Sequence, residues 1–288
     1  VQQWRRIRVL LYDRQSLYVV RGTLTTMILR KVLPILFLIA MTSCAGQTYR
    51  VDAGPMFVRA RGELALANSS QVMPPGNDLS DNLGLGDREV SPYIGFRTDV
   101  EKHRVRVNGF YLDTEGSGTL GDGINGSAPG AGNTSHGNIA AGTVVQTTMD
   151  FFAIAANYSY EAWSDEAYRV ALGAQLGYYS LDVSAKSTGG REEVTSEVFV
   201  PMPYIAAEAF WKDFTFGTNM GIMAGKFGDG SGRYIDLESY ASWAVNQSYD
   251  VKAGYRFILL DGYGRASSRD FDADVDLQGL YISGGIRF

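Results

Sequence analysis

Residues 151–178 read FFAIAANYSYEAWSDEAYRVALGAQLGY and contain the pattern that decides the fold. Apolar and aromatic side chains occupy every second position from Phe152 to Tyr160 and again from Val170 to Tyr178, on either side of the turn signal Ser164–Glu166. Small or polar residues (Ala, Gly, Asn, Ser and Gln) fill the positions between them. Because successive side chains of a strand point to opposite faces, this stretch predicts a hairpin with one apolar and one polar face.

The same alternation recurs through the chain after residue 47. It predicts ten strands, with 8 to 12 as the open range, at about 49–60, 93–99, 104–111, 152–160, 170–178, 205–211, 214–222, 235–243 and 249–259, with a last strand that runs to Phe288. Short turns near Glu101, Ser164, Lys212 and Asn246 alternate with longer polar stretches at 61–88, 116–142, 186–191, 225–232 and after Asp261. Short turns on one side and long loops on the other indicate an all-β, closed antiparallel up-and-down transmembrane β-barrel with both ends on the side of the short turns. Closure removes the strand edges that lipid cannot solvate.

The first 46 residues differ in character from the rest. From Met27 the chain has a short basic region, an apolar stretch (Val32–Met41) and small residues up to Gly46, which is the layout of a secretory signal. The apolar stretch is shorter than the ~20 residues that a spanning helix needs. We therefore expect 1–46 to be an upstream extension plus a signal peptide, and 47–288 to be the barrel. Cys44 is either a lipidated residue or, as we favour, is removed with the signal.

A membrane barrel is favoured over a soluble one by two features. The polar face of the predicted strands carries charges of both signs at mid-strand, which suits an interior better than a lipid-facing surface. Trp163, Trp211, Trp243 and Tyr249 all lie beside the predicted short turns, where an aromatic girdle is expected at a membrane interface.

The C-terminal residues 280–288, LYISGGIRF, alternate up to a terminal aromatic residue. This ending resembles the assembly signal that outer-membrane barrels present to the barrel-insertion machinery, with Ile282, Ile286 and Phe288 as its residues. Over 47–288 the layout is similar to the small OmpA-like, OmpW-like or porin-like barrels of Gram-negative bacteria. The resemblance implies a location in the bacterial outer membrane, with lipids, lipopolysaccharide and the insertion machinery as partners; no functional partner is indicated.

Charge and cysteine content exclude several classes of protein. Seven of the 26 basic residues and one of the 31 acidic residues precede residue 47, so the remainder carries a net charge of −11. An acidic chain is unsuited to nucleic-acid binding, which depends on Lys and Arg neutralising phosphates. The single cysteine rules out an intrachain disulfide and a multi-cysteine zinc site.

Charged residues on the polar face are the candidates for lining a pore. They are Arg97, Arg104, Arg106, Glu208, Lys252, Arg256, Asp272 and Asp274. The last two belong to an acidic stripe at Asp270, Asp272, Asp274 and Asp276, which either lines the mouth of the barrel or is solvated beyond the bilayer. The parity of the alternation changes between Leu277 and Leu280, which predicts a β-bulge near Gly279.

No catalytic, cofactor or metal residues are predicted. Acyl or peptide transfer needs a base held in a fixed geometry, and the two histidines fall in a short turn (His103) and in a Gly-rich loop (His136). The acidic stripe lacks a recognisable calcium loop. We expect a non-enzymatic barrel of structural or surface-interaction type that acts through its external loops; the alternative is a narrow porin-like channel for small solutes or cations.

Overall fold

The computed structural model describes residues 47–68, 76–121, 139–227, 230–266 and 269–288. The predictions for the signal segment, Cys44 and His136 lie outside these residues. Within them, there is no helix long and apolar enough to cross a membrane.

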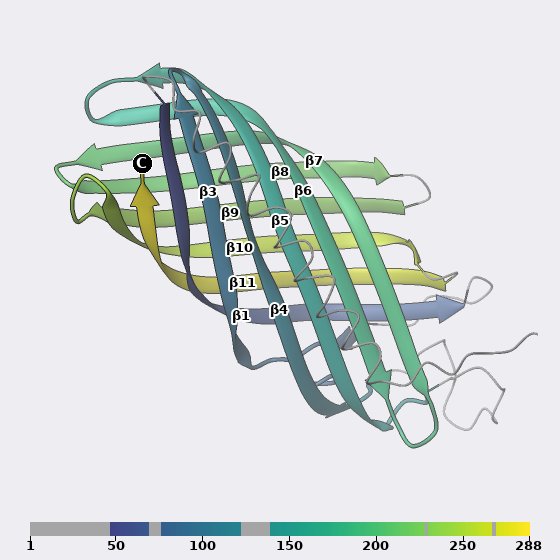
Figure 1. Ribbon diagram of the computed structural model, residues 1–288. Helices are drawn as coiled ribbons and strands as arrows, with labels where there is room; N and C mark the ends of the chain where they lie inside the picture. The colour runs from purple at the N-terminus through teal and green to yellow at the C-terminus, as the bar shows by residue number, and fades with distance from the viewer. Residues whose placement is uncertain (1–46, 69–75, 122–138, 228–229, 267–268) are drawn as a thin grey trace, which may run out of the picture. The chain divides into compact units, whose positions relative to one another are not determined.

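The described chain is an antiparallel sheet that closes on itself. Its strands are β1 (Gln47–Asn68), β2 (Asn77–Asp78), β3 (Arg88–Val100), β4 (His103–Thr119), β5 (Val144–Ser164), β6 (Tyr168–Lys186), β7 (Arg191–Trp211), β8 (Phe214–Phe227), β9 (Gly230–Ala244), β10 (Tyr249–Ala266) and β11 (Arg269–Arg287). Each long strand pairs with its sequence neighbour, and β11 pairs with β1 from Arg287–Arg50 to Arg269–Asn68, which closes the ring (Figure 1). The two-residue β2 pairs only with β1. The prediction of ten strands in an up-and-down barrel is confirmed.

Connections on one side of the barrel are tight, as predicted. Turns at 101–102, 165–167, 212–213 and 245–248 join β3 to β4, β5 to β6, β7 to β8 and β9 to β10. The opposite side differs from the prediction, because the strands run further than expected. Four residues separate β6 from β7, and two residues separate β8 from β9 and β10 from β11. Long outer connections therefore follow only β1 and β4, and the prediction of five long loops is wrong for three.

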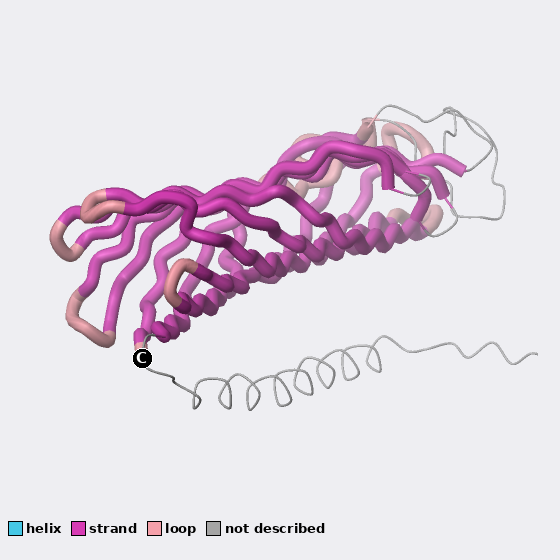
Figure 2. Tube along the Cα trace, turned by 90° about the horizontal axis from the view of Figure 1, so that it is seen from above, coloured by secondary structure: helices cyan, strands magenta, loops and turns pink. Residues whose placement is uncertain are grey.

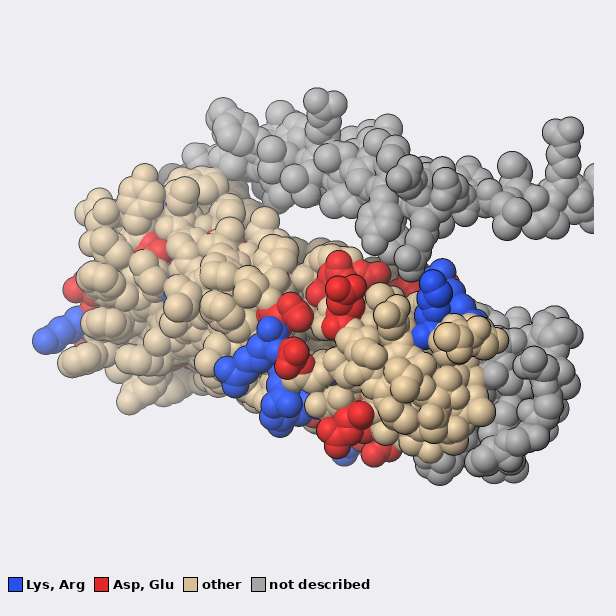
Figure 3. All heavy atoms as spheres, turned by 90° about the horizontal axis from the view of Figure 1, so that it is seen from below, with Lys and Arg blue, Asp and Glu red and all other residues tan. Residues whose placement is uncertain are grey.

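An apolar belt surrounds the barrel next to the tight turns. The outward side chains are uncharged from Tyr249 to Leu259 on β10 and from Trp211 back to Phe199 on β7. The next outward residues are Asp261 and Glu197. This height matches the ~9–11 residues with which a tilted strand crosses a bilayer. The space-filling view shows the same division, with an uncharged tan surface bounded by a zone of red and blue side chains (Figure 3).

Aromatic side chains mark both margins of the belt. Trp163, Trp211 and Trp243 are exposed beside the tight turns, and Phe214 lies against both Trp211 and Trp243, with ring centroids 6.0 and 6.4 Å away. At the other margin, Phe199 packs against Tyr178 with centroids 4.7 Å apart. The side with the tight turns is the periplasmic side in barrels of this layout, and we call the opposite end the outer end.

Beyond the belt the two faces of the sheet exchange character. On β11, Ser283 faces inward and Ile282 outward in the belt, whereas Val275 faces inward and Asp274 outward near the outer end. The register of β11 with β10 and β1 keeps one offset throughout, so the predicted bulge near Gly279 is absent. The apolar residues of β11 change from outward to inward positions because the surroundings of the strand change from lipid to water. The register of the strand does not shift.

The ladder between β7 and β8 is incomplete. β7 pairs with β6 from Arg191 to Ala209, but it pairs with β8 only from Trp211–Phe214 to Tyr204–Gly221. Beyond that point the two strands diverge, with β7 running away from the β8–β11 side of the barrel (Figure 1). The tube view shows the strands continuing to the outer end (Figure 2).

A comparable divergence beside β3 is filled by the chain itself. The segment 77–87 lies between β1 and β4: Leu79 donates its N–H to the Gly62 carbonyl at 2.8 Å, and the Asn82 amide donates to the Thr119 carbonyl at 3.1 Å. Its leucines, Leu79, Leu83 and Leu85, are buried inside the barrel. Among the described residues, nothing fills the β7–β8 divergence in this way.

Candidate functional site

The interior at belt height is organised around Glu208 of β7, whose side chain is 1% exposed. Arg104 binds both of its carboxylate oxygens, at 2.9 and 3.0 Å, and Arg97 approaches one of them at 3.0 Å. Arg169 lies 3.2 Å from the other oxygen, and the Tyr240 hydroxyl donates a hydrogen bond at 2.6 Å. Such charge-assisted, bidentate contacts hold a buried carboxylate rigidly.

A second cluster surrounds Glu238 of β9. Arg106 donates to its oxygens at 2.5 and 2.6 Å, and the Tyr281 hydroxyl also donates to it. Lys252 lies 3.9 Å from the same carboxylate and 2.9 Å from Asp52. The Lys252 ammonium also lies between 5.2 and 5.4 Å from the ring centroids of Tyr93, Tyr240 and Tyr281. Aromatic faces and two carboxylates together compensate the burial of this one ammonium group.

Two further carboxylates complete this layer. Asp236 accepts from Arg256 at 3.0 and 2.9 Å and from the Gln175 amide at 2.8 Å. Nearer the periplasmic end, Asp250 contacts Arg50 at 2.7 Å and Arg287 at 2.8 Å. The interior at belt height is thus a cross-linked layer of ion pairs.

An apolar layer lies above the charged one, toward the outer end. Its buried side chains come from most of the strands and from the segment 77–87, and include Met56, Val58, Leu79, Leu112, Met149, Phe151, Val200, Met202, Ile258 and Leu277. They pack across the barrel and form its hydrophobic core. A packed apolar layer thus lies between the charged layer and the outer end of the barrel.

The structure separates the eight candidate pore-lining residues into two groups. Arg97, Arg104, Arg106, Glu208, Lys252 and Arg256 lie inside the barrel and form the clusters above. Asp272 and Asp274 are exposed on the outer surface of β11, so they do not line the interior. Their neighbour Ala273 points inward instead, because apolar side chains face inward beyond the belt.

The C-terminal residues that resemble an assembly signal form the end of β11. Ile282, Ile286 and Phe288 are exposed on the lipid-facing side. Phe288 stacks on Tyr49 with ring centroids 5.9 Å apart, and its N–H donates to the Tyr49 carbonyl at 3.1 Å. The terminal residue is therefore part of the seam between the first and last strands, and its role in assembly stays a prediction.

His103 has no charged partner suited to acid–base catalysis in the described part of the chain. It is exposed at the start of β4, 2.8 Å from the Tyr158 hydroxyl, with its ring 5.3 Å from that of Tyr160. This is the environment of a residue at the membrane interface.

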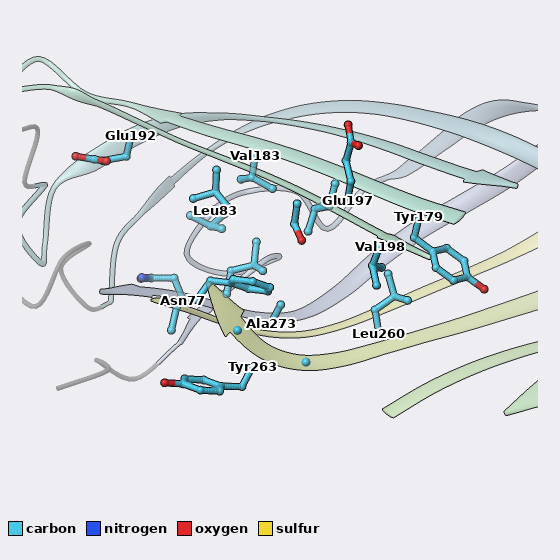
Figure 4. Close-up of a pocket in the computed structure, with 18 of the residues that line it drawn as sticks. Asn77, Leu83, Tyr179, Val183, Glu192, Glu197, Val198, Leu260, Tyr263 and Ala273 are labelled. Atoms are coloured by element: carbon cyan, nitrogen blue, oxygen red, sulfur yellow. The ribbon is translucent and has the colours of Figure 1, made fainter. Parts of the chain in front are cut away.

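Sequence reasoning missed a cavity of about 450 Å³ in the outer part of the barrel. Inward side chains of β6, β7, β10 and β11 approach it, and Figure 4 shows Val183, Val198, Leu260 and Ala273 around it. Its size is within the range of small-molecule sites. The signal that could have revealed it is the change of parity after Leu277, which places apolar side chains inside and charges outside.

One comparison with solved structures bears on the fold. The outer-membrane protease OmpT from Escherichia coli matches with a TM-score of 0.53 over 85% of this chain and 96% of that one, at 10% identity. The chain folds as a bacterial outer-membrane β-barrel. At this identity the likeness concerns the fold alone, and the belt, the girdle and the charged interior of this outer-membrane barrel agree with it.

Other outer-membrane barrels match with lower scores. They include Neisserial surface protein A, at 16% identity and a TM-score of 0.32 over 85% of this chain and 98% of that one. The attachment invasion locus protein Ail of Yersinia pestis matches at 11% identity and 0.32, over 85% and 100%. No protein-family model matches the barrel. No curated protein matches it either.

Proposed function

We propose that this outer-membrane barrel does not conduct solutes and acts at its outer surface as a structural or surface-interaction protein. The observation that carries the proposal is the cross-linked charged layer at belt height with the apolar layer packed above it. Glu208, Glu238 and Asp236 each hold their cations within hydrogen-bonding distance, and a packed apolar layer covers them. Breaking a buried ion pair costs free energy, because it leaves an uncompensated buried charge. The charged layer therefore favours a closed interior over a water-filled channel.

The outer end supplies a surface for interaction. The strands extend past the apolar belt and carry outward carboxylates on both sides of the barrel. Asp113, Asp150 and Asp182 lie opposite one another on β4, β5 and β6, and Asp261 lies opposite Asp274 on β10 and β11. A surface of this charge suits a cationic partner more than an anionic one.

A narrow channel is the competing function, and single-channel recording separates the two. Residues 47–288, refolded and inserted in a planar bilayer, are expected to give no stable conductance steps. Insertion is verified in parallel by the shift in gel mobility between folded and heat-denatured protein. Stable steps from inserted protein would overturn the proposal and support the channel; the variant Glu208→Gln would then identify the conducting layer by a change in ion preference.

A further inference from the structure

The outer cavity carries an inference that goes beyond the proposed surface role and does not depend on it. Its lining is largely aliphatic and aromatic, with Leu64, Leu181, Val183, Leu260 and Phe271 among the residues. These side chains are only partly buried, although they point into the barrel. Inward apolar side chains left accessible in this way are the usual feature of a site for an apolar ligand.

The surroundings of the cavity resemble those of a soluble ligand-binding barrel. Beyond the belt, the neighbours of the lining residues point outward and are charged: Asp182 beside Val183, Asp261 beside Leu260, and Asp272 beside Phe271. An apolar interior inside a water-facing barrel wall encloses a small ligand in soluble β-barrels. The outer part of this chain has that arrangement, above a floor made by the apolar layer.

The chemistry of the lining selects against anions. Among its described residues there is no Lys or Arg, and the charged side chains are Glu192 and Glu197. Glu192 lies near the outer end of β7, and Figure 4 shows the Glu197 side chain pointing away from the cavity. A ligand carboxylate or phosphate would meet no cation here and would lose its hydration. The fitting ligand is an uncharged apolar molecule.

The incomplete β7–β8 ladder indicates how such a molecule reaches the cavity. Pro201 and Pro203 lie on β7, immediately beyond the last paired residue Tyr204. Both prolines are in register with β6, opposite Leu176 and Ala174, so the strand continues through them on that side only. Proline has no N–H to donate and is confined to strand edges. The sequence itself therefore ends the ladder within the outer part of the apolar belt.

The unpaired part of β7 borders the cavity. The β7 residues Val194, Ser196 and Val198 line it, and across the divergence the next lining residues are Ser231 and Tyr234 of β9. Open strand edges are disfavoured against lipid, because their polar groups cannot be solvated. We propose that the outer cavity binds an uncharged apolar small molecule, which enters from the outer leaflet between β7 and β8.

Photolabelling tests the site directly. Residues 47–288 are reconstituted in lipid nanodiscs with an uncharged dodecane that carries a diazirine, irradiated, and mapped by mass spectrometry. Adducts are expected on Leu181, Val183 and Val194, with a yield that falls at least tenfold when excess unlabelled dodecane is added. Lipid-facing Phe199 is expected to label without saturation. Absence of interior adducts, or failure of excess dodecane to reduce them, would overturn the site.

A matched pair of variants on β11 separates filling of the cavity from a general effect. Ala273→Phe fills the cavity and is expected to reduce the interior adducts at least tenfold, whereas Asp272→Phe, on the outer face next to it, changes them less than twofold. If Ala273→Phe does not fold, Leu260→Trp fills the same cavity from β10. Equal labelling of the filled and the control variant would contradict the proposal.

Two further experiments test the preference for an uncharged ligand and the route of entry between β7 and β8. A dodecanoic acid carrying the same diazirine is expected to give at least tenfold fewer saturable adducts; an equal yield would contradict the preference for an uncharged ligand.

Disulfide cross-linking tests the entry between β7 and β8. The double variant Phe199→Cys with Lys226→Cys is expected to stay reduced under copper–phenanthroline, since cysteines with distant Cα atoms cannot be bridged. Ala207→Cys with Thr218→Cys, in the paired region, is expected to cross-link. Equal cross-linking of the two pairs would mean that the ladder is closed.

Discussion

Glu208 is the residue on which most of the charged interior depends. Three guanidinium groups and the Tyr240 hydroxyl converge on its carboxylate. A neutral amide cannot balance those cations, and breaking a buried pair by removing one partner costs about 3–5 kcal/mol. Glu208→Gln is therefore expected to lower the free energy of unfolding by about that amount, measured by urea titration of the refolded barrel in detergent micelles.

The control for this prediction is an ion pair outside the barrel. Arg191 and Glu193 lie 2.7 Å apart with side chains 48% and 49% exposed, and exposed pairs contribute about 0–1 kcal/mol. Glu193→Gln should leave the unfolding midpoint almost unchanged. If the two variants unfold at the same urea concentration, the charged layer does not stabilise the fold.

At the scale of a single strand, β7 combines a complete ladder on one side with an interrupted one on the other. Replacing Pro201 and Pro203 by valine restores two N–H donors without adding charge to the belt. We expect the β7–β8 ladder to extend, so that the amide hydrogens of Ile222 and Ala224, opposite positions 203 and 201, exchange at least tenfold more slowly, measured by hydrogen–deuterium exchange and mass spectrometry. Val170→Ile on β6 serves as a control, because it leaves both ladders intact. Unchanged exchange would show that the prolines do not limit the pairing.

The strands also show how far sequence reasoning reaches. Alternation and turn signals predicted the ten strands and the four tight turns, because these depend on local residue types such as those at Ser164–Glu166 and Lys212–Asp213. The placement of Asp272 and Asp274 was wrong, because period-two alternation does not tell which face is inward. That choice depends on where the bilayer ends, which is a property of all the strands together.

On the scale of the whole molecule, the apolar belt and its aromatic girdle fix the depth of the barrel in a bilayer. Trp163, Trp211 and Trp243 are all exposed beside the tight turns. In residues 47–288, tryptophan fluorescence should be quenched more by lipids brominated near the headgroup than by lipids brominated at the chain ends, because indole rings prefer the interface. The opposite order of quenching would contradict the depth assigned to the belt.

The cavity and the ion pairs of the interior could not be predicted from the sequence, for the same reason. Contacts such as Arg104 with Glu208, or Lys252 with Asp52, join residues far apart in the chain. Their polar character indicated an interior, but their partners follow only from the closure of the ring. The candidate pore-lining residues therefore indicated which side chains lie inside the barrel. That the interior does not conduct stays a prediction.

The seam between the ends of the chain has a consequence for the order of folding events. Asp52 of β1 binds Lys252 of β10, and Arg50 of β1 binds Asp250 of the same strand, so both pairs reach past β11. These bonds cannot exist until the first and last strands have met, since their partners are separated by nearly the whole barrel. These ion pairs thus form only after the ring has closed, and they then stabilise the closed barrel. An incompletely closed chain keeps those charges hydrated, which favours its release from the bilayer over its retention as an open sheet.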